Sequence, residues 1–205
     1  MPGILVDGAI RKAIADGAVE IEPYNPDQIN PASYDITLGS GVAVYKQWVH
    51  TWGHRWFGAE DGRFFTRRNA ILDVRFEPQV AEYQIDPQKG WVLKPGIGYL
   101  MHAHERVTTG EYVIVVDGKS SIGRLFLQVH ATAGYIDPGF DGQYTLEVIV
   151  QHPLRVFPGM RLGQIRFHTA EGELENDYSK VGHYKKEGAR GAVASKAWRQ
   201  FTEGR

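Results

Sequence analysis

Residues 118–147 of this 205-residue chain read GKSSIGRLFLQVHATAGYIDPGFDGQYTLE. Within this stretch, short runs of aliphatic and aromatic residues alternate with turns marked by glycine, such as the tripeptide Asp137-Pro138-Gly139. Short apolar runs separated by such turns are typical of antiparallel strands joined by tight connections. The pattern therefore predicts a β-sandwich or a β-barrel, and it disfavours a fold built from βαβ units.

The same pattern extends outward over most of the chain. Near the start, Asp7 can cap a helix that carries Ile10 and Ile14 on one face, and Gly17 ends it. No repeat of fixed period and no linker follows, so residues 1–205 are expected to form a single domain. The expected strands are 35–38, 41–45, 91–93, 97–101, 112–116, 125–130, 144–150 and 161–167.

Two segments depart from this pattern. Residues 46–70 are rich in tryptophan, phenylalanine, arginine and glycine, which fits either a lid or oligomer contact or a structured insertion with its own cluster. We expect the insertion. Residues 178–205 mix glycine with basic residues, and a flexible tail is the ordinary expectation for a terminus. Lys185 and its basic neighbours are alternatively able to close over a bound phosphate chain.

Charge and composition narrow the class of function. The formal net charge is −1, so no overall field draws the protein to a polyanion. No apolar run is long enough to span a membrane, and the first residues lack a basic-then-apolar leader pattern. We therefore expect a soluble cytoplasmic protein that binds neither nucleic acid nor membrane, and any recognition of phosphate must be local.

The chain contains no cysteine. Disulfides, thiolate nucleophiles and cysteine-bound metals are therefore excluded, and with them the zinc site of the cytidine deaminases. A deaminase built from this sequence must activate water with a side chain. His102 and His104 share a predicted strand face and resemble a metal pair, but no third ligand lies nearby in sequence, so we expect surface or interface histidines and no protein-bound metal.

The turn at residues 118–124 combines hydroxyls, cations and glycines, which are the groups that a triphosphate requires. It is not a Walker A motif. Taken alone, it indicates an ordinary polar turn at least as readily as a binding site. The candidate phosphate ligands in this turn are Lys119, Ser120, Ser121, Gly123 and Arg124.

Two carboxylates follow. Asp137 starts a turn, as aspartate before proline often does, but it also presents a carboxylate beside aromatic rings. Glu147 lies in a predicted strand with Thr145 on its own face and Leu146 and Val148 on the other. That face is either exposed to solvent in simple alternation or lines a buried polar site.

At these residues the chain closely resembles the dCTP deaminases, and above all the bifunctional dCTP deaminase–dUTPases, within the dCTP deaminase/dUTPase superfamily. Residues 118–147 carry the central motif. The match continues through INPASYDITLG at 29–39, VLKPG at 92–96 with Glu105-Arg106, and FPGMRLGQ at 157–164. Several matches in the same order are far more specific than one, and they cover nearly the whole chain apart from residues 46–70 and much of the tail.

The resemblance implies a mainly β fold, a distorted barrel of the jelly-roll-like β-clip or dUTPase type, with a short N-terminal helix. It also implies a homotrimer with active sites at the subunit interfaces. Glu147 falls on the family's catalytic glutamate, and residues 119–124 fall on its triphosphate-binding turn. Ser120 and Arg124 are then close to the reacting base, where they position water or stabilise developing charge.

The resemblance assigns the remaining site residues as well. Asp137 matches a residue at the deoxyribose that leaves a 2′-hydroxyl no room, and residues 145–147, including Leu146, match the lining of the pyrimidine site. Gln164 matches a glutamine of the bifunctional enzymes, while Tyr178 and Lys185 match tail residues that touch phosphates. One departure occurs in the tail, where the expected glutamine four residues after Lys185 is Ala189.

The expected reaction is zinc-independent deamination of dCTP, with Mg²⁺ arriving on the triphosphate. Gly134-Tyr135 stands where monofunctional relatives carry His-Arg, which predicts a bifunctional enzyme that forms dUMP, ammonia and diphosphate, with Asp137 activating the second water. The alternatives are a monofunctional deaminase that releases dUTP, a plain dUTPase that should lack Glu147, and a non-catalytic nucleotide-binding β-barrel.

Overall fold

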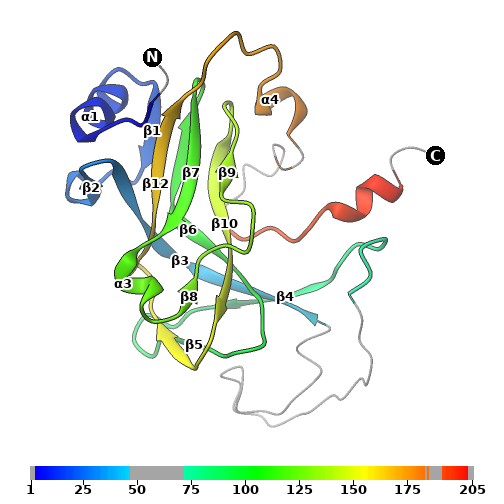
Figure 1. The fold of residues 1–205 in the computed structure, drawn as a ribbon. Helices are drawn as coiled ribbons and strands as arrows, with labels where there is room; N and C mark the ends of the chain where they lie inside the picture. Colours follow the sequence, from blue (N-terminus) through cyan, green and yellow to red (C-terminus); the bar gives the residue numbers. More distant parts are fainter. Residues whose placement is uncertain (1–2, 47–71, 183, 185–190, 203–205) are drawn as a thin grey trace.

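The computed structural model describes residues 3–46, 72–182, 184 and 191–202. The aromatic insertion expected at 46–70 lies outside these residues except for Lys46, and Lys185 lies outside them too. Most of the described chain belongs to one strongly curled antiparallel sheet (Figure 1). Its strands, in spatial order, are β8 (Leu127–Gln128), β10 (Asp141–Val150), β6 (Tyr99–Thr109), β3 (Ser33–Tyr45), β12 (Arg161–Thr169), β7 (Tyr112–Gly118) and β9 (Tyr135–Ile136).

Three shorter strands extend this sheet. β1 (Val19–Glu22) pairs with β6, while β2 (Ile29–Asn30) and β4 (Val80–Gln84) pair with β3. A separate two-stranded ribbon joins β5 (Trp91–Leu93) to β11 (Leu154–Val156). Every described pairing is antiparallel, which confirms the expected mainly β class and agrees with the absence of βαβ units from the sequence pattern.

Helices are short and few among the described residues. They are α1 (Asp7–Ala15), η1 (Pro26–Gln28), α3 (Ser120–Gly123), α4 (Tyr178–Val181) and η3 (Ala197–Phe201). Helix α1 buries Ile10 as expected, but Asp7 is its first helical residue and not its cap. Val6 stands at the N-cap and makes no side-chain hydrogen bond there. The described residues contain no helix long and apolar enough to cross a membrane.

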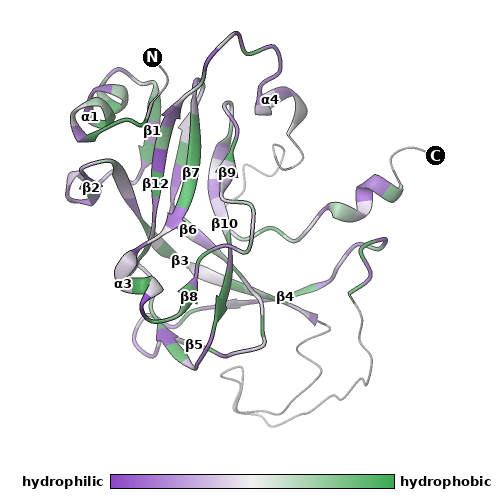
Figure 2. Cartoon of the chain, viewed as in Figure 1, coloured by the Kyte–Doolittle hydropathy of each residue, from purple (hydrophilic) through white to green (hydrophobic). Residues whose placement is uncertain are grey.

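The core fills the inside of the curled sheet, where the hydrophobic residues of the central strands gather (Figure 2). Along β10 every second residue is buried, as a strand of period two requires. Each fully buried Leu, Ile or Phe contributes roughly 1.5–3 kcal/mol to folding. The largest side chains buried in this way include Tyr34, Ile36, Leu38, Tyr99, Met101, Leu146, Ile165 and Phe167.

The predicted strand at 125–130 is the main difference between expectation and structure. Only Leu127–Gln128 pairs there, because Phe126 has a positive φ of 53° that takes the backbone out of the extended region. The two strands predicted at 35–38 and 41–45 are instead parts of the single strand β3, whose pairing with β6 shifts register between Leu38 and Val42.

The imidazole of His102 explains this irregularity in β3. Gly41 donates its backbone N–H to Nε2 of His102 at 3.1 Å, and Nδ1 lies 2.8 Å from the carbonyl oxygen of Ala103. The ring therefore lies directly on the backbone of Gly39 and Gly41. A Cβ added to Gly39 would come within 2.0 Å of Cε1 of His102, so no larger residue fits at that position without displacing the ring.

Replacement of Gly39 by alanine is therefore expected to lower the free energy of unfolding by about 1–3 kcal/mol, the range for overpacking a well-packed core. Gly8→Ala is the matched control, because it lies in α1 with nothing within 4 Å of the added Cβ and should leave stability unchanged or raise it. Urea denaturation of both variants measures the difference. Equal stability of the two would contradict the close packing of His102 on β3.

Candidate active site

Glu147 stands on the half-buried face of β10. Thr145 shares that face, while Leu146 and Val148 point into the core and are almost fully buried. Pairing with β6 places Glu147 opposite Leu100 and Thr145 opposite His102. Of the residues expected to line a pyrimidine, Thr145 and Glu147 therefore offer side chains, whereas Leu146 offers only its backbone.

A cavity of about 620 Å³ lies against this face of β10, a volume within the usual range for a small-molecule site. Its walls come from β3, β6, β10, the segment 130–136, α4 and the tail. They are largely apolar and aromatic, and the described lining contains no lysine or arginine. The side chains that define its shape include Tyr45, Leu100, His130, Tyr135, Phe140, Thr145, Glu147, Tyr178, Tyr184 and Val193.

The carboxylate of Glu147 is held from one side. The backbone N–H of Ala131 donates to Oε2 at 3.0 Å, so the segment that follows β8 fixes the orientation of the side chain. Within the described part of the chain, Oε1 of Glu147 has no hydrogen-bond partner. A carboxylate fixed through one oxygen and open at the other can accept a proton from a water molecule in the cavity.

Asp137 lies at the edge of the same region, in the exposed turn before β10. The aromatic ring of Tyr178 packs edge-on against Phe140 with ring centroids 5.6 Å apart. Burial raises the pKa of the Tyr178 hydroxyl, and the charge of Asp137 raises it further. Asp137 and Tyr178 are therefore near each other, and Tyr178 brings α4 to the cavity wall.

Part of the tail is hydrogen-bonded along the pocket face. Gly191 donates its N–H to Oε1 of Gln143 at 2.9 Å, and Val193 donates to Oγ1 of Thr145 at 3.0 Å. Ser195 donates to the hydroxyl of Tyr45 at 3.2 Å. The segment 191–195 thus runs across β10 beside Glu147. Sequence reasoning missed Gln143 and Tyr45 as anchors, because the pairing is between segments far apart in the chain.

The predicted phosphate turn forms a second group of site residues. Lys119 is the N-cap of the one-turn helix α3, and Ser120, Ser121, Gly123 and Arg124 are exposed on it. None of residues 119–124 lines the cavity beside Glu147. Helices α3 and α4 lie at opposite ends of the β10 region, with α3 low and α4 high in Figure 1.

A buried carboxylate organises this second group. Asp35 is fully buried in β3, and its Oδ1 lies 2.5 Å from Nζ of Lys119. The amide of Asn30 donates to the same oxygen at 2.7 Å, and Nη1 of Arg161 lies 3.4 Å from Oδ2. Asp35 was not among the predicted site residues, although it is the one charged residue of β3, and a charge in a buried strand is a sign of a paired charge.

Gln164 belongs to the same group. Its Nε2 donates to the carbonyl oxygen of Gly118 at 3.0 Å, and its Oε1 accepts from the hydroxyl of Ser33 at 2.8 Å. The structure therefore brings Gln164 to the base of the phosphate turn, next to Lys119. The predicted site residues that the structure describes fall into two sets within one chain. Thr145, Leu146, Glu147 and Tyr178 line the cavity, with Asp137 near its edge, and Gln164 lies with the turn 119–124, which Lys119 ties to Asp35.

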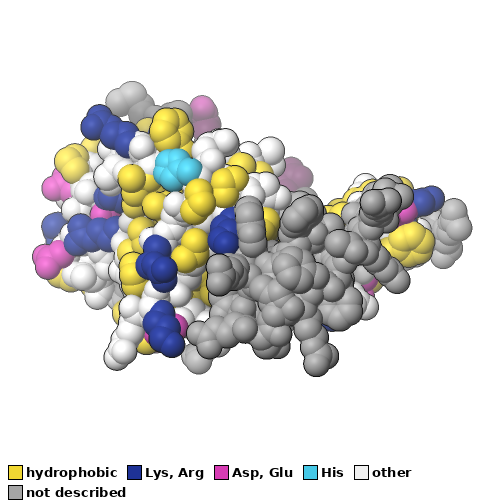
Figure 3. All heavy atoms as spheres, turned by 90° about the horizontal axis from the view of Figure 1, so that it is seen from below, with side chains coloured by type: hydrophobic (Ala, Val, Ile, Leu, Met, Phe, Trp, Pro, Cys, Tyr) yellow, Lys and Arg dark blue, Asp and Glu magenta, His cyan; other side chains and the backbone are white. Residues whose placement is uncertain are grey.

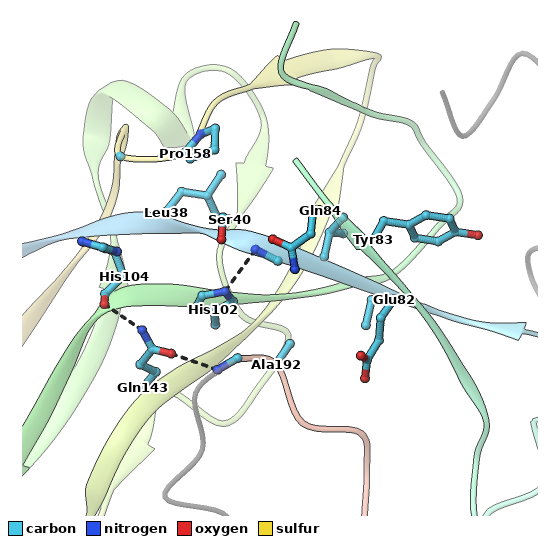
Figure 4. A pocket seen from close by; sticks show the side chains of 15 residues that line it. Leu38, Ser40, Glu82, Tyr83, Gln84, His102, His104, Gln143, Pro158 and Ala192 are labelled. Carbon is cyan, nitrogen blue, oxygen red and sulfur yellow. Dashed lines mark hydrogen bonds between the residues drawn. The ribbon is translucent and has the colours of Figure 1, made fainter. Parts of the chain in front are cut away.

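A second cavity of about 630 Å³ lies between β3, β4 and β6 (Figure 4). Gln143 separates it from the first cavity, because its Nε2 donates to the carbonyl oxygen of His104 at 2.8 Å while its Oε1 accepts from the tail. Both ring nitrogens of His102 already have partners, and burial lowers the pKa of this imidazole. His102 and His104 are therefore poorly suited to act as a metal pair.

A family model described as dCTP deaminase-like matches residues 4–170, which contain both sets of site residues apart from Tyr178 and the tail. The chain belongs to the dCTP deaminase-like family. A curated relative from Cytophaga hutchinsonii, named "dCTP deaminase, dUMP-forming", is 38% identical over 167 residues, which cover 82% of each chain. One of the same name from Thermobifida fusca is 32% identical over 205 residues, covering 97% of this chain and 95% of that protein.

Among solved structures, this dCTP deaminase-like chain is similar to the 2′-deoxycytidine 5′-triphosphate deaminase from Agrobacterium tumefaciens. The TM-score is 0.57 at 27% identity, and the match covers 84% of this chain. The chain spans 50% of the length of that protein. The similarity confirms the expected fold class, a curled β fold with a short N-terminal helix, while the roles of individual site residues stay predictions.

Proposed function

We propose that this protein is a hydrolase that deaminates dCTP and also releases diphosphate, so that its products are dUMP, ammonia and diphosphate. The observation that carries the proposal is the placement of Glu147, fixed through one oxygen and facing a cavity of nucleotide size. The names of the relatives, which are dUMP-forming dCTP deaminases over most of the chain length, support the same substrate and product.

Deamination at this site begins when water attacks C4 of the cytosine ring and Glu147 takes the proton. Glu147 passes this proton to N3 of the ring, then takes the proton of the new hydroxyl group and delivers it to the amino nitrogen, so that the bond from C4 to nitrogen breaks and ammonia leaves. One water is consumed, and the ring keeps a carbonyl at C4. General acid–base catalysis of this kind contributes about 10²–10⁴ in rate. Ser120 and Arg124 are proposed to position the water and to stabilise the developing charge.

Release of diphosphate consumes a second water, which attacks the α-phosphorus and breaks the bond to the bridging oxygen of the β-phosphate. Asp137 is the proposed base, because it is an exposed carboxylate in the turn beside the cavity. Gly134 keeps that turn compact: a Cβ there would lie 2.6 Å from the carbonyl oxygen of Val116 and 2.8 Å from Nε2 of His130. The absence of a bulky cation at 134–135 leaves room for this second water.

The separation of the two sets of site residues supports a homotrimer with active sites at the subunit interfaces. Glu147 lies in a cavity without a lysine or arginine in its described lining, whereas Lys119 and Arg124 lie on α3. A triphosphate needs cations close to its phosphate oxygens. We therefore assign Glu147 and the phosphate turn of each active site to two different subunits, and we place Lys185 of the tail near the same phosphates.

Mg²⁺ is proposed to enter with the triphosphate and to neutralise part of its charge. Within residues 3–46, 72–182, 184 and 191–202, no three His, Asp or Glu side chains come together as a cation site. A cytoplasmic location accompanies this function, since nucleoside triphosphates are substrates of the cell interior.

Glu147→Gln tests the catalytic role directly. The amide keeps the size and one acceptor oxygen but cannot take a proton, so release of ammonia from dCTP should fall at least about 10²-fold while nucleotide binding persists. Glu20→Gln makes the same change on the exposed face of β1 and should have no effect. Near-normal turnover by the Glu147 variant would show that this carboxylate is only the polar side of a strand.

Early product analysis distinguishes the bifunctional enzyme from a simple deaminase. Chromatography of the first turnovers should give dUMP and diphosphate in step with ammonia, with little free dUTP. Asp137→Asn should slow diphosphate release at least about tenfold, because the amide is a far poorer base than the carboxylate. Accumulation of dUTP in equal amounts with ammonia, without diphosphate, would identify a monofunctional enzyme.

The metal requirement is open to a separate measurement. A zinc-selective chelator should leave deamination unchanged, and elemental analysis of the purified protein should find no stoichiometric zinc. Removal of Mg²⁺ should slow the reaction, and added Mg²⁺ should restore it, because the metal accompanies the substrate. One tightly held zinc ion per subunit that activity requires would overturn the proposed mechanism.

A further inference from the structure

Phe126 has an unusual backbone conformation for a large residue. Among the described residues other than glycine, it alone has a positive φ, at 53°. An L-residue with a bulky side chain is strained in this left-handed region, where glycine is not. The backbone on both sides holds it there: Phe126 donates its N–H to the carbonyl oxygen of Gly123 at 2.9 Å, and its own carbonyl oxygen accepts from Gln151 at 3.2 Å.

The strained residue gains little from packing within its own chain. Phe126 is 62% exposed, and its ring lies edge-on to His152, with ring centroids 6.1 Å apart. Leu125 beside it is 42% exposed. The face seen in Figure 3 shows hydrophobic side chains interleaved with Lys and Arg. A strained position that displays an aromatic ring to solvent indicates a functional constraint, because the described residues bury little of this ring.

The position of Phe126 in the chain indicates what it contacts. It lies two residues after Arg124, which ends α3 and its phosphate turn. The cavity at Glu147 has a largely apolar described lining with two carboxylates, of which Asp141 already pairs with Arg106 and Glu147 has no ion-pair partner among the described residues. One surface thus offers the cation of Arg124 next to exposed apolar side chains, and the other offers the carboxylate of Glu147 next to apolar walls. The two surfaces are complementary in charge and in polarity.

We infer that Leu125 and Phe126 form an anchor that docks on a second copy of this chain beside its Glu147 cavity, so that Arg124 of the first copy reaches that cavity. This inference rests on the proposed interfacial active site and adds the residue that holds the two subunits in register. Burial of the phenyl ring in the contact offsets the free energy of the backbone strain. An isolated subunit has the same strain but does not bury the ring. Aromatic residues that enter such contacts commonly dominate their binding energy.

Two substitutions of Phe126 distinguish the effect of its ring from the effect of its backbone strain. Phe126→Gly removes both the ring and the strain, whereas Phe126→Ala removes the ring and keeps the strain. Both should raise the protein concentration at the midpoint of assembly at least about tenfold in sedimentation velocity. As dissociated subunits, the glycine variant should resist urea better than the alanine variant. Phe76→Ala is the matched control, because that ring is 66% exposed elsewhere and should not affect assembly.

Enzyme activity tests the anchor independently of sedimentation. If dCTP is the substrate, turnover per subunit by Phe126→Gly should be lost at low protein concentration and return to the wild-type value when the protein is concentrated. Assembly of Phe126→Gly at the wild-type concentration would overturn the anchor, even if wild-type protein deaminates dCTP normally. Wild-type protein that assembles through Phe126 but leaves dCTP unchanged would instead overturn the proposed function and keep the anchor.

Discussion

Strand β10 pairs with β6 from Asp141 to Val148, and this pairing decides which of its side chains enter the core. Because the side-chain period of a strand is two, a slip of one residue would expose Leu146 and Val148 and bury Glu147 among apolar groups. Such a slip would cost several buried aliphatic side chains, each worth roughly 1.5–3 kcal/mol. The core therefore holds Glu147 on the pocket face, and the geometry of the proposed catalytic site depends on packing on the opposite side of the same strand.

The second constraint is the buried carboxylate of Asp35. A fully buried charge is tolerated only when it is paired and hydrogen-bonded, and Asp35 has Lys119, Arg161 and the amide of Asn30. Breaking a buried pair by removal of one partner typically costs about 3–5 kcal/mol, although the exposure of Arg161 reduces its share. Asp35 thereby ties the start of the phosphate turn to β3 and fixes where α3 begins. Lys119 thus has a structural role, and the proposed contact with the triphosphate falls on the same residue.

These two constraints act on different parts of one subunit and divide the chemistry between them. The β10 face supplies a proton acceptor and an apolar pocket, and the α3 region supplies cations and hydroxyls. The tail connects to the first part through backbone N–H groups of Gly191 and Val193, which donate to the side-chain oxygens of Gln143 and Thr145. Under the proposed function, a division of this kind makes assembly a condition of activity, because the described lining of the Glu147 cavity offers a base without a lysine or arginine.

The sequence by itself determined the β class, the alternation along β10 and the composition of the phosphate turn, because strand periodicity and turn residues are local properties. It also indicated Glu147, Asp137 and residues 119–124 through the order of the motifs. Only the tertiary structure decided that Asp35 pairs with Lys119, that His102 rests on Gly39, and that Phe126 takes a left-handed conformation. The first two are contacts between residues far apart in sequence, and the conformation of Phe126 depends on a hydrogen bond from Gln151, so no local pattern encodes them. The division of the site into two sets is also a property of the tertiary structure, because the curled sheet places β10 and α3 apart.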